Sequence, residues 1–164
     1  IEDETLRLCG HAHVSGEALP LAKFDLLRGL SDDEIARIEG IVTRRVFQAG
    51  EFVFRADSEG HELMLIGRGE VRVSLPNRAG GAIHLASFSR GQFFGEMSFL
   101  DGRVHSADVC ATRETELLVL DRRQFARVAA DDARMGVSVM RGLALAIADR
   151  LRHANAELRE MRDA

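Results

Sequence analysis

At 164 residues, the chain has room for one domain with a modest hydrophobic core and a terminal helix. Hydrophobic residues make up 46% of the sequence and charged residues 29%, the usual balance of a soluble protein. The formal net charge of -4 disfavours nucleic acid as a partner, because binding to a phosphate backbone requires a basic face. No apolar run approaches the ~20 residues of a membrane-spanning helix, so we expect no membrane contact by this segment itself.

The first residues give little sign of packed structure. The sequence begins at Ile1 without a signal-peptide pattern, so we expect residues 1–22 to be a leader or linker from an upstream domain. Cys9 and Cys110 lie in unlike contexts and predict no disulfide framework. A reducing cytoplasmic location is therefore expected, which includes the cytosolic part of a membrane protein.

The histidines do not form a recognisable metal site. Cys9, His11 and His13 are close in sequence, but their spacing matches no standard zinc pattern. A metal site of the cupin type needs a His-x-His pair together with another His and a carboxylate on the strands, whereas His61 and His84 stand alone. No nucleophile with an ordered base is visible either. We therefore expect no metal, no cofactor and no enzymatic activity.

A short helix is predicted for residues 32–42. Ser31 and Glu34 have the Ser-x-x-Glu spacing of a capping box, and Ile35 and Ile38 follow at helical spacing. From residue 43 to residue 121 the hydrophobic residues instead alternate with polar or small ones, and glycine-containing turns interrupt them at intervals of about 8 to 12 residues. This pattern predicts an antiparallel β-sandwich or barrel.

Helical periodicity returns after Asp121. We expect a short helix over residues 122–130, then a long helix over residues 133–162 that is capped by Asp131 or Asp132. Residues at alternating spacings of four and three form a heptad seam along the long helix: Met140, Ala144, Ile147, Leu151, Ala154, Leu158 and Met161. The far end of this seam extends past the predicted barrel, so we expect a homodimer through this helix.

The stretch from residue 91 to residue 111 carries the clearest signal for ligand binding. Gly95 precedes a short predicted helix that begins at Glu96. A glycine there lets the backbone approach a ligand, and the first N–H groups of a helix lack intrahelical partners. Such donors suit a phosphate.

The segment Phe94-Gly95-Glu96-Met97-Ser98-Phe99-Leu100, followed by His105-Ser106-Ala107, resembles the phosphate-binding cassette of the cyclic nucleotide-binding domain family. The resemblance extends upstream through residues 50–54 and 63–73. It implies an α+β fold in which an antiparallel β jelly-roll barrel has a short N-terminal helix and C-terminal helices, the last one long. The jelly-roll domain would occupy residues 23–130, and a lid or dimerisation helix residues 131–164.

The resemblance also implies which residues bind the ligand. Glu96 would accept a hydrogen bond from the ribose 2′-hydroxyl, although it could simply cap its helix. Ser106 would bind a phosphate oxygen, although a serine on a strand surface has the same pattern. The expected ligand-binding set is Phe94, Gly95, Glu96, Met97, Ser98, His105, Ser106 and Ala107.

His105 stands where the family usually has arginine, the main contact of the cyclic phosphate. Histidine is shorter and mostly neutral at pH 7, and losing a charge-assisted hydrogen bond commonly costs about 1.5 to 3 kcal/mol. Two compensations are open: Arg103 could swing in, or His105 could take up a proton when the ligand binds, so that affinity would rise as the pH falls below about 6.5. Arg150 on the long helix is a further candidate, for contact with the base.

These features predict a regulatory module that senses cyclic AMP, cyclic GMP or a related small phosphate ligand weakly. We expect it to be the C-terminal part of a larger protein, with a covalently attached effector domain upstream. The alternative is a structural or dimerisation module that has kept the fold and lost the ligand. A thermal-shift screen separates the two, because ligand at 100 times its dissociation constant adds about 2.7 kcal/mol of stability.

Overall fold

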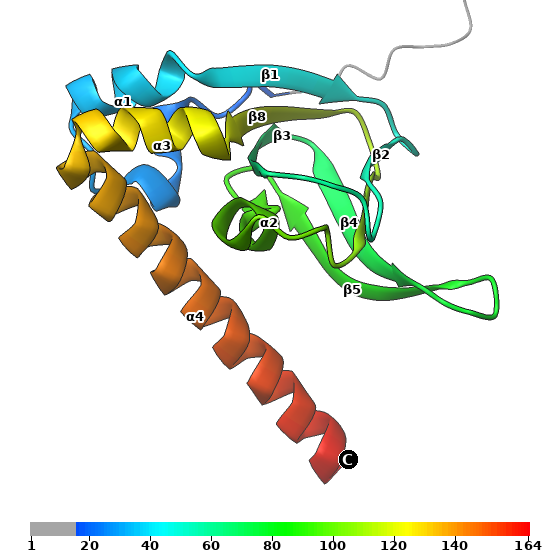
Figure 1. The fold of residues 1–164 in the computed structure, drawn as a ribbon. Helices are drawn as coiled ribbons and strands as arrows, with labels where there is room; N and C mark the ends of the chain where they lie inside the picture. The colour runs from blue at the N-terminus through cyan, green and yellow to red at the C-terminus, as the bar shows by residue number, and fades with distance from the viewer. Residues whose placement is uncertain (1–15) are drawn as a thin grey trace, which may run out of the picture.

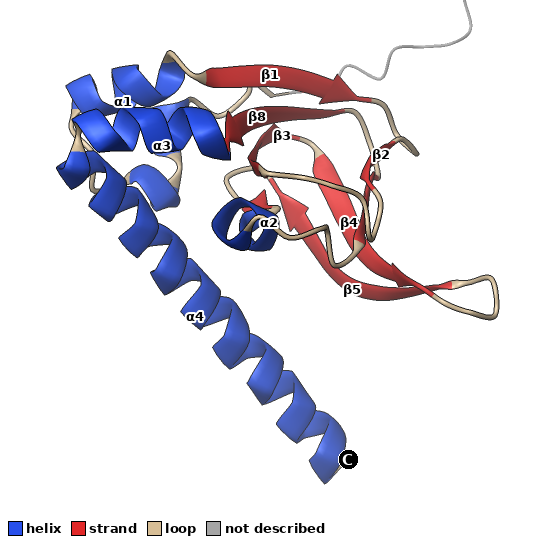
Figure 2. Ribbon diagram, viewed as in Figure 1, coloured by secondary structure: helices blue, strands red, loops and turns tan. Residues whose placement is uncertain are grey.

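The computed structural model describes residues 16–164, so the cluster of Cys9, His11 and His13 lies outside the described residues. Two antiparallel sheets pack as a sandwich, and most of the helices gather at one end of it (Figures 1 and 2). The predicted α+β jelly-roll fold is confirmed, with one difference in detail. The strands form two separate four-stranded sheets and not a closed barrel.

The described strands, in chain order, are β1 (Val42–Phe47), β2 (Phe52–Phe54), β3 (Glu62–Arg68), β4 (Glu70–Pro76), β5 (Ala82–Ser89), β6 (Phe93–Phe94), β7 (Asp108–Ala111) and β8 (Thr115–Asp121). One sheet has the order β1-β8-β3-β6 and the other the order β2-β7-β4-β5. Strands that are distant in sequence therefore lie side by side. In particular, β6 leaves the edge of the first sheet and leads directly into the cassette.

Strand β3 is buried on both faces. Its side chains alternate between two hydrophobic clusters, since successive residues of a strand point to opposite sides. Leu63 and Leu65 pack toward the helices, whereas Met64 and Ile66 pack between the sheets. This central position explains why the sequence of β3 is a continuous hydrophobic run from Leu63 to Ile66.

Several hydrophobic residues of the alternating pattern are exposed and not in the core. Val46 lies on β1, at the edge of its sheet, and Ile83 and Leu85 lie on β5, at the edge of the other. The β4–β5 hairpin extends beyond the body of the sandwich (Figure 1). Alternation shows which side of a strand is apolar, but whether that side is covered depends on the neighbouring elements.

The described helices are α1 (Asp32–Glu39), α2 (Glu96–Asp101), α3 (Arg122–Asp131) and α4 (Ala133–Asp163), and two 3-10 turns (Leu21–Lys23 and Asp25–Leu27) precede them. The predicted capping box forms, with Ser31 and Glu34 each accepting from the backbone N–H of the other. Helix α1 ends three residues earlier than predicted, because the chain turns at Gly40 and enters β1 at Val42.

Helix α4 is packed only over its first part. Met135, Val139 and Leu143 are fully buried against α3, the first sheet and the N-terminal turns, whereas every residue from Leu151 onward is exposed. The helix runs diagonally past the sandwich (Figure 1). In the described part of the chain, no helix combines the length and hydropathy of a membrane span.

The division of the chain at residue 22 stays a prediction, but packing begins before that residue. Leu21 is buried in the core, and the Leu19 backbone N–H donates to the Gly67 carbonyl at 2.8 Å. Residues 19–22 therefore belong physically to the sandwich. The expected leader can be no longer than the residues that precede them.

Candidate functional site

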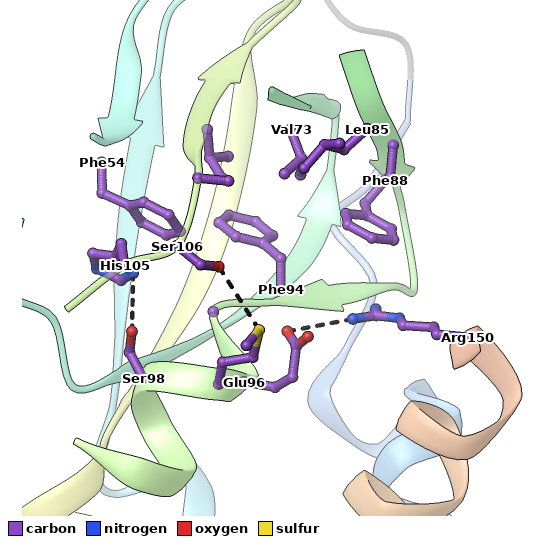
Figure 3. Close-up of a pocket in the computed structure, with 15 residues that line it drawn as sticks. Phe54, Val73, Leu85, Phe88, Phe94, Glu96, Ser98, His105, Ser106 and Arg150 are labelled. Carbon is purple, nitrogen blue, oxygen red and sulfur yellow. Dashed lines mark hydrogen bonds and ion pairs between the residues drawn. The ribbon is translucent and has the colours of Figure 1, made fainter. Parts of the chain in front are cut away.

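A cavity of about 210 Å³ opens between the second sheet, the cassette and α4 (Figure 3). Its walls are mostly apolar. The lining residues are Phe54, Val73, Leu85, Ala86, Phe88, Phe94, Gly95, Glu96, Met97, Ser98, His105, Ser106, Ala107, Val109 and Arg150. The volume is below the roughly 300–1,000 Å³ of typical drug-sized sites, so the cavity suits a small ligand.

The structure brings together all eight residues of the expected ligand-binding set, since each of them lines this cavity. Arg150 lines it as well, although it is far away in the sequence. Arg103 does not. Its side chain is exposed, and its backbone N–H donates to the Asp101 carboxylate at 2.9 Å.

Gly95 is required by the backbone at the start of the cassette helix. Its φ of 79° is in the left-handed region, which side chains other than glycine rarely adopt. A Cβ there would also lie 2.7 Å from the Glu62 carbonyl oxygen of β3. The close approach of these two backbones fixes where α2 begins and therefore where Glu96 points.

Glu96 and Arg150, which both line the cavity, form an ion pair (Figure 3). The guanidinium Nη1 lies 3.3 Å from a carboxylate oxygen, and both side chains are mostly buried, 28% exposed for Arg150 and 17% for Glu96. This pair connects the cassette to α4. Glu96 therefore faces the cavity and does more than begin its own helix.

The Arg150 guanidinium is also engaged on its other sides. It donates to the Phe93 carbonyl and lies over the Phe88 and Phe93 rings, with 4.4 and 4.2 Å between its central carbon and the ring centroids. Burial lowers the pKa of this guanidinium, and Glu96 opposes the shift. Arginine remains charged even so, because its usual pKa is far above neutral.

His105 is buried in the cavity wall, and its polar atoms contact other residues. Its ring stacks on the Phe54 ring, with centroids 3.5 Å apart and planes 6° apart. One ring nitrogen, Nδ1, lies 3.3 Å from the Ser98 hydroxyl. The other, Nε2, packs so closely against Gly60 that a Cβ at that glycine would be 1.8 Å away. Both nitrogens are therefore directed at the protein.

The surroundings of His105 favour its neutral form. Burial lowers the pKa of the imidazole, and nearby His61 lowers it further, whereas Glu62 raises it. Protonation on ligand binding stays a prediction, but this geometry weighs against it. A second proton on this ring would point at Ser98 or at Gly60 and not at a ligand.

Ser106 offers the cavity a hydroxyl. The side chain is exposed, and its hydroxyl makes a long contact of 3.7 Å with the Met97 sulfur. Sulfur is a weak acceptor, so this hydroxyl can exchange the contact for a better partner. Its contact with a phosphate oxygen stays a prediction.

Comparison with known families decides the classification. Residues 44–132 match the model of the cyclic nucleotide-binding domain. The chain belongs to the cyclic nucleotide-binding domain family. Family members of this type are regulatory, and the catabolite activator protein and protein kinase A regulatory subunits are among the structural neighbours of this domain.

Similar proteins place such a domain in different contexts. The chain is 33% identical over 157 residues to Glutaminase 1 of Bradyrhizobium diazoefficiens, covering 96% of the chain but 25% of that protein. It is 34% identical over 133 residues to the cyclic AMP receptor protein of Thermus thermophilus, covering 81% of the chain and 60% of that protein. The chain thus spans about a quarter of the length of the glutaminase.

Solved structures of the family share the fold. The catabolite activator protein of Thermus thermophilus has a TM-score of 0.72 at 33% identity, covering 84% of the chain and 62% of that structure. A regulatory subunit of a cAMP-independent protein kinase A from Trypanosoma cruzi, bound to guanosine, has a TM-score of 0.59 at 30% identity and covers 64% of the chain and 37% of that structure. A mutant of the Trypanosoma brucei subunit, bound to cAMP, has a TM-score of 0.66 at 27% identity, covering 77% and 44%.

The cavity wall opposite the cassette has no recognisable signal in the sequence. Val73, Leu85 and Phe88 come from the β4–β5 hairpin, and Phe54 comes from β2. The alternating pattern does not mark them as cavity residues, because it cannot distinguish a filled interior from an open one. Leu85 lines the cavity and is exposed, so this wall is accessible to solvent.

Proposed function

We propose that this domain is a regulatory module that binds a cyclic nucleotide weakly in the cavity beside Glu96. It would pass occupancy to an attached effector through α4. The observation that carries this proposal is the ion pair of Glu96 with Arg150, because it joins the ligand cavity to the C-terminal helix. A ligand that engages the Glu96 carboxylate must share it with Arg150 or displace Arg150, and either change alters the contact that holds α4 in place.

Weak binding is proposed because of the environment of His105. The position that carries arginine in the family pattern here holds a buried ring whose nitrogens face Ser98 and Gly60. An anionic ligand would therefore lack a charge-assisted contact at this position. Such a loss costs about 1.5 to 3 kcal/mol, which is roughly tenfold to more than a hundredfold in affinity.

The effector is proposed to be an enzyme or another functional domain on the same polypeptide. Support comes from similar proteins that are much longer than this chain. The chain covers about a quarter of the length of each of two glutaminases of Bradyrhizobium diazoefficiens. Placement of the module at the C-terminal end of its protein is part of the same proposal. So is the absence of catalytic activity in the module itself.

Calorimetric titration of the chain with cyclic AMP and cyclic GMP tests the proposal. We expect weak but saturable binding, about tenfold weaker binding to Glu96→Gln, and unchanged binding to Glu116→Gln, a carboxylate on β8 outside the cavity lining. Absence of binding by the original chain, together with unchanged thermal stability at saturating nucleotide, would favour the alternative of a structural module without a ligand.

A further inference from the structure

The charges around the cavity balance to zero. Among the described lining residues, the carboxylate of Glu96 and the guanidinium of Arg150 carry charge, and they are paired with each other. The imidazole of His105 is held toward its neutral form by burial. The side chains of this cavity therefore offer no net charge to pair with an anion, whose transfer from water into a partly apolar site is unfavourable unless it is paired there.

Arg150 is poorly placed to pair with a ligand phosphate. Its guanidinium already contacts the Glu96 carboxylate and the Phe93 carbonyl, and the Phe88 and Phe93 rings cover its faces. Turning it toward an anion would break these contacts. It would also leave the Glu96 carboxylate mostly buried next to the incoming negative charge, which is a second penalty.

The cavity instead offers the groups that an uncharged sugar and a flat apolar ring require. Glu96 and Ser106 can accept hydrogen bonds from sugar hydroxyls without disturbing a charge balance. Val73, Leu85 and Phe88 form an apolar wall against which a base can lie (Figure 3). None of these contacts depends on a phosphate.

We propose that the preferred ligand of this cavity is a nucleoside without a phosphate group and not its cyclic monophosphate. The inference rests on the proposed function, since it assigns a ligand class to the same site. The nucleoside would place its sugar hydroxyls at Glu96 and its base against the β4–β5 wall. It would share the Glu96 carboxylate with Arg150 and not displace the guanidinium, so no buried charge loses its partner.

Competition between matched ligands tests this inference on the unmodified chain. Calorimetric titrations use adenosine, guanosine, cytidine and uridine, each alongside its own cyclic monophosphate. We expect at least one nucleoside to bind about tenfold or more tightly than its cyclic monophosphate, because the cyclic phosphate adds an unpaired anion and removes the free 3′- and 5′-hydroxyls as hydrogen-bond donors. A smaller preference, or a preference for the cyclic monophosphate, overturns the inference and leaves the proposed function standing.

Failure of every ligand to bind overturns both the inference and the proposed function, so the two are distinguishable. The variant His105→Arg provides a matched control with a cation restored at the cassette. We expect it to bind the cyclic monophosphate about tenfold or more tightly than the original chain does, with little change for the nucleoside. An equal gain for both ligands would show that charge is not what discriminates between them, and would also overturn the inference.

Discussion

The guanidinium of Arg150 lies 3.3 Å from the carboxylate of Glu96, and this pair joins the last helix to the first residue of the cassette helix. The Phe93 carbonyl accepts a further hydrogen bond from Arg150. Since α4 carries no buried side chain beyond Leu143, Arg150 is the last strong attachment of this helix to the described sandwich. The lining of the cavity and the packed part of α4 are therefore joined through the Arg150 side chain.

Replacement of Arg150 by glutamine should destabilise the domain, because Glu96 would keep its mostly buried charge without a partner. We expect the free energy of unfolding to fall by about 1 to 3 kcal/mol in denaturant titrations. Arg141→Gln is the matched control, because Arg141 is an exposed residue of the same helix. Its effect should stay within about 0.5 kcal/mol. Equal effects of the two substitutions would show that the ion pair contributes nothing.

The location of the cassette could be predicted from the sequence because its signals are local. A glycine needed for a left-handed turn, a glutamate at the start of a helix and the His-Ser-Ala segment lie within one short stretch, and all of them line the cavity. The caps of α1, α3 and α4 are local in the same sense, since each Ser or Asp bonds to amides within three residues. Local chemistry of this kind survives folding largely unchanged.

The pH dependence of stability should report the burial of His105. Its pKa is lower in the folded chain than the usual 6.5, so the unfolded chain binds more protons at this site as the pH falls. The contribution of His105 to the free energy of unfolding is therefore fully present above pH 6.5. It is lost as the pH falls from 6.5 toward the lowered pKa of the folded chain. Denaturant titrations at a series of pH values from about 8 to about 5 measure this loss.

Two glutamine variants assign that loss to a histidine. His105→Gln should flatten the slope below pH 6.5, because its side chain does not titrate. His84→Gln should retain the slope, since His84 is exposed on β5. Burial is the largest influence on the pKa of His105. Glu62 raises this pKa and His61 lowers it, and the pKa stays below its usual value. An unchanged slope in His105→Gln would contradict the role of this buried ring.

The backbone at Gly95 should be intolerant of any side chain. Gly95→Ala forces a left-handed φ on alanine and brings its Cβ to 2.7 Å from the Glu62 carbonyl oxygen. Gly50→Ala has a similar φ of 87° and no atom within 4 Å of the added Cβ, so it isolates the conformational cost. We expect a loss of about 1 kcal/mol for Gly50→Ala and at least about 2 kcal/mol for Gly95→Ala, measured by thermal unfolding. Equal losses would mean that β3 and the cassette can move apart freely.

The properties that decide which ligand binds could not be predicted from the sequence, because they depend on contacts between distant segments. His105 was expected to face a phosphate, but Phe54 from β2 and Gly60 from the following loop hold its ring elsewhere. The sequence alone is equally compatible with an exposed position for Arg150 on α4. Its contacts with Glu96 and Phe88 place it in the cavity lining instead. A single sequence gives the residue types of a site, whereas long-range packing sets the direction in which their polar atoms point.

The exposed part of α4 should form a homodimer through its heptad seam. Leu158 lies on this seam and is 63% exposed in the single chain, and Leu151 and Met161 are exposed on either side of it along the helix. Leu158→Gln should weaken the dimer about tenfold or more, because burying a leucine contributes roughly 1.5 to 3 kcal/mol per side chain. Leu145→Gln is the matched control, since Leu145 is 62% exposed on the same helix but lies off the seam. Analytical ultracentrifugation over a range of concentrations compares the three proteins. A monomeric original chain, or equal weakening by both substitutions, would rule out the seam as the dimer contact.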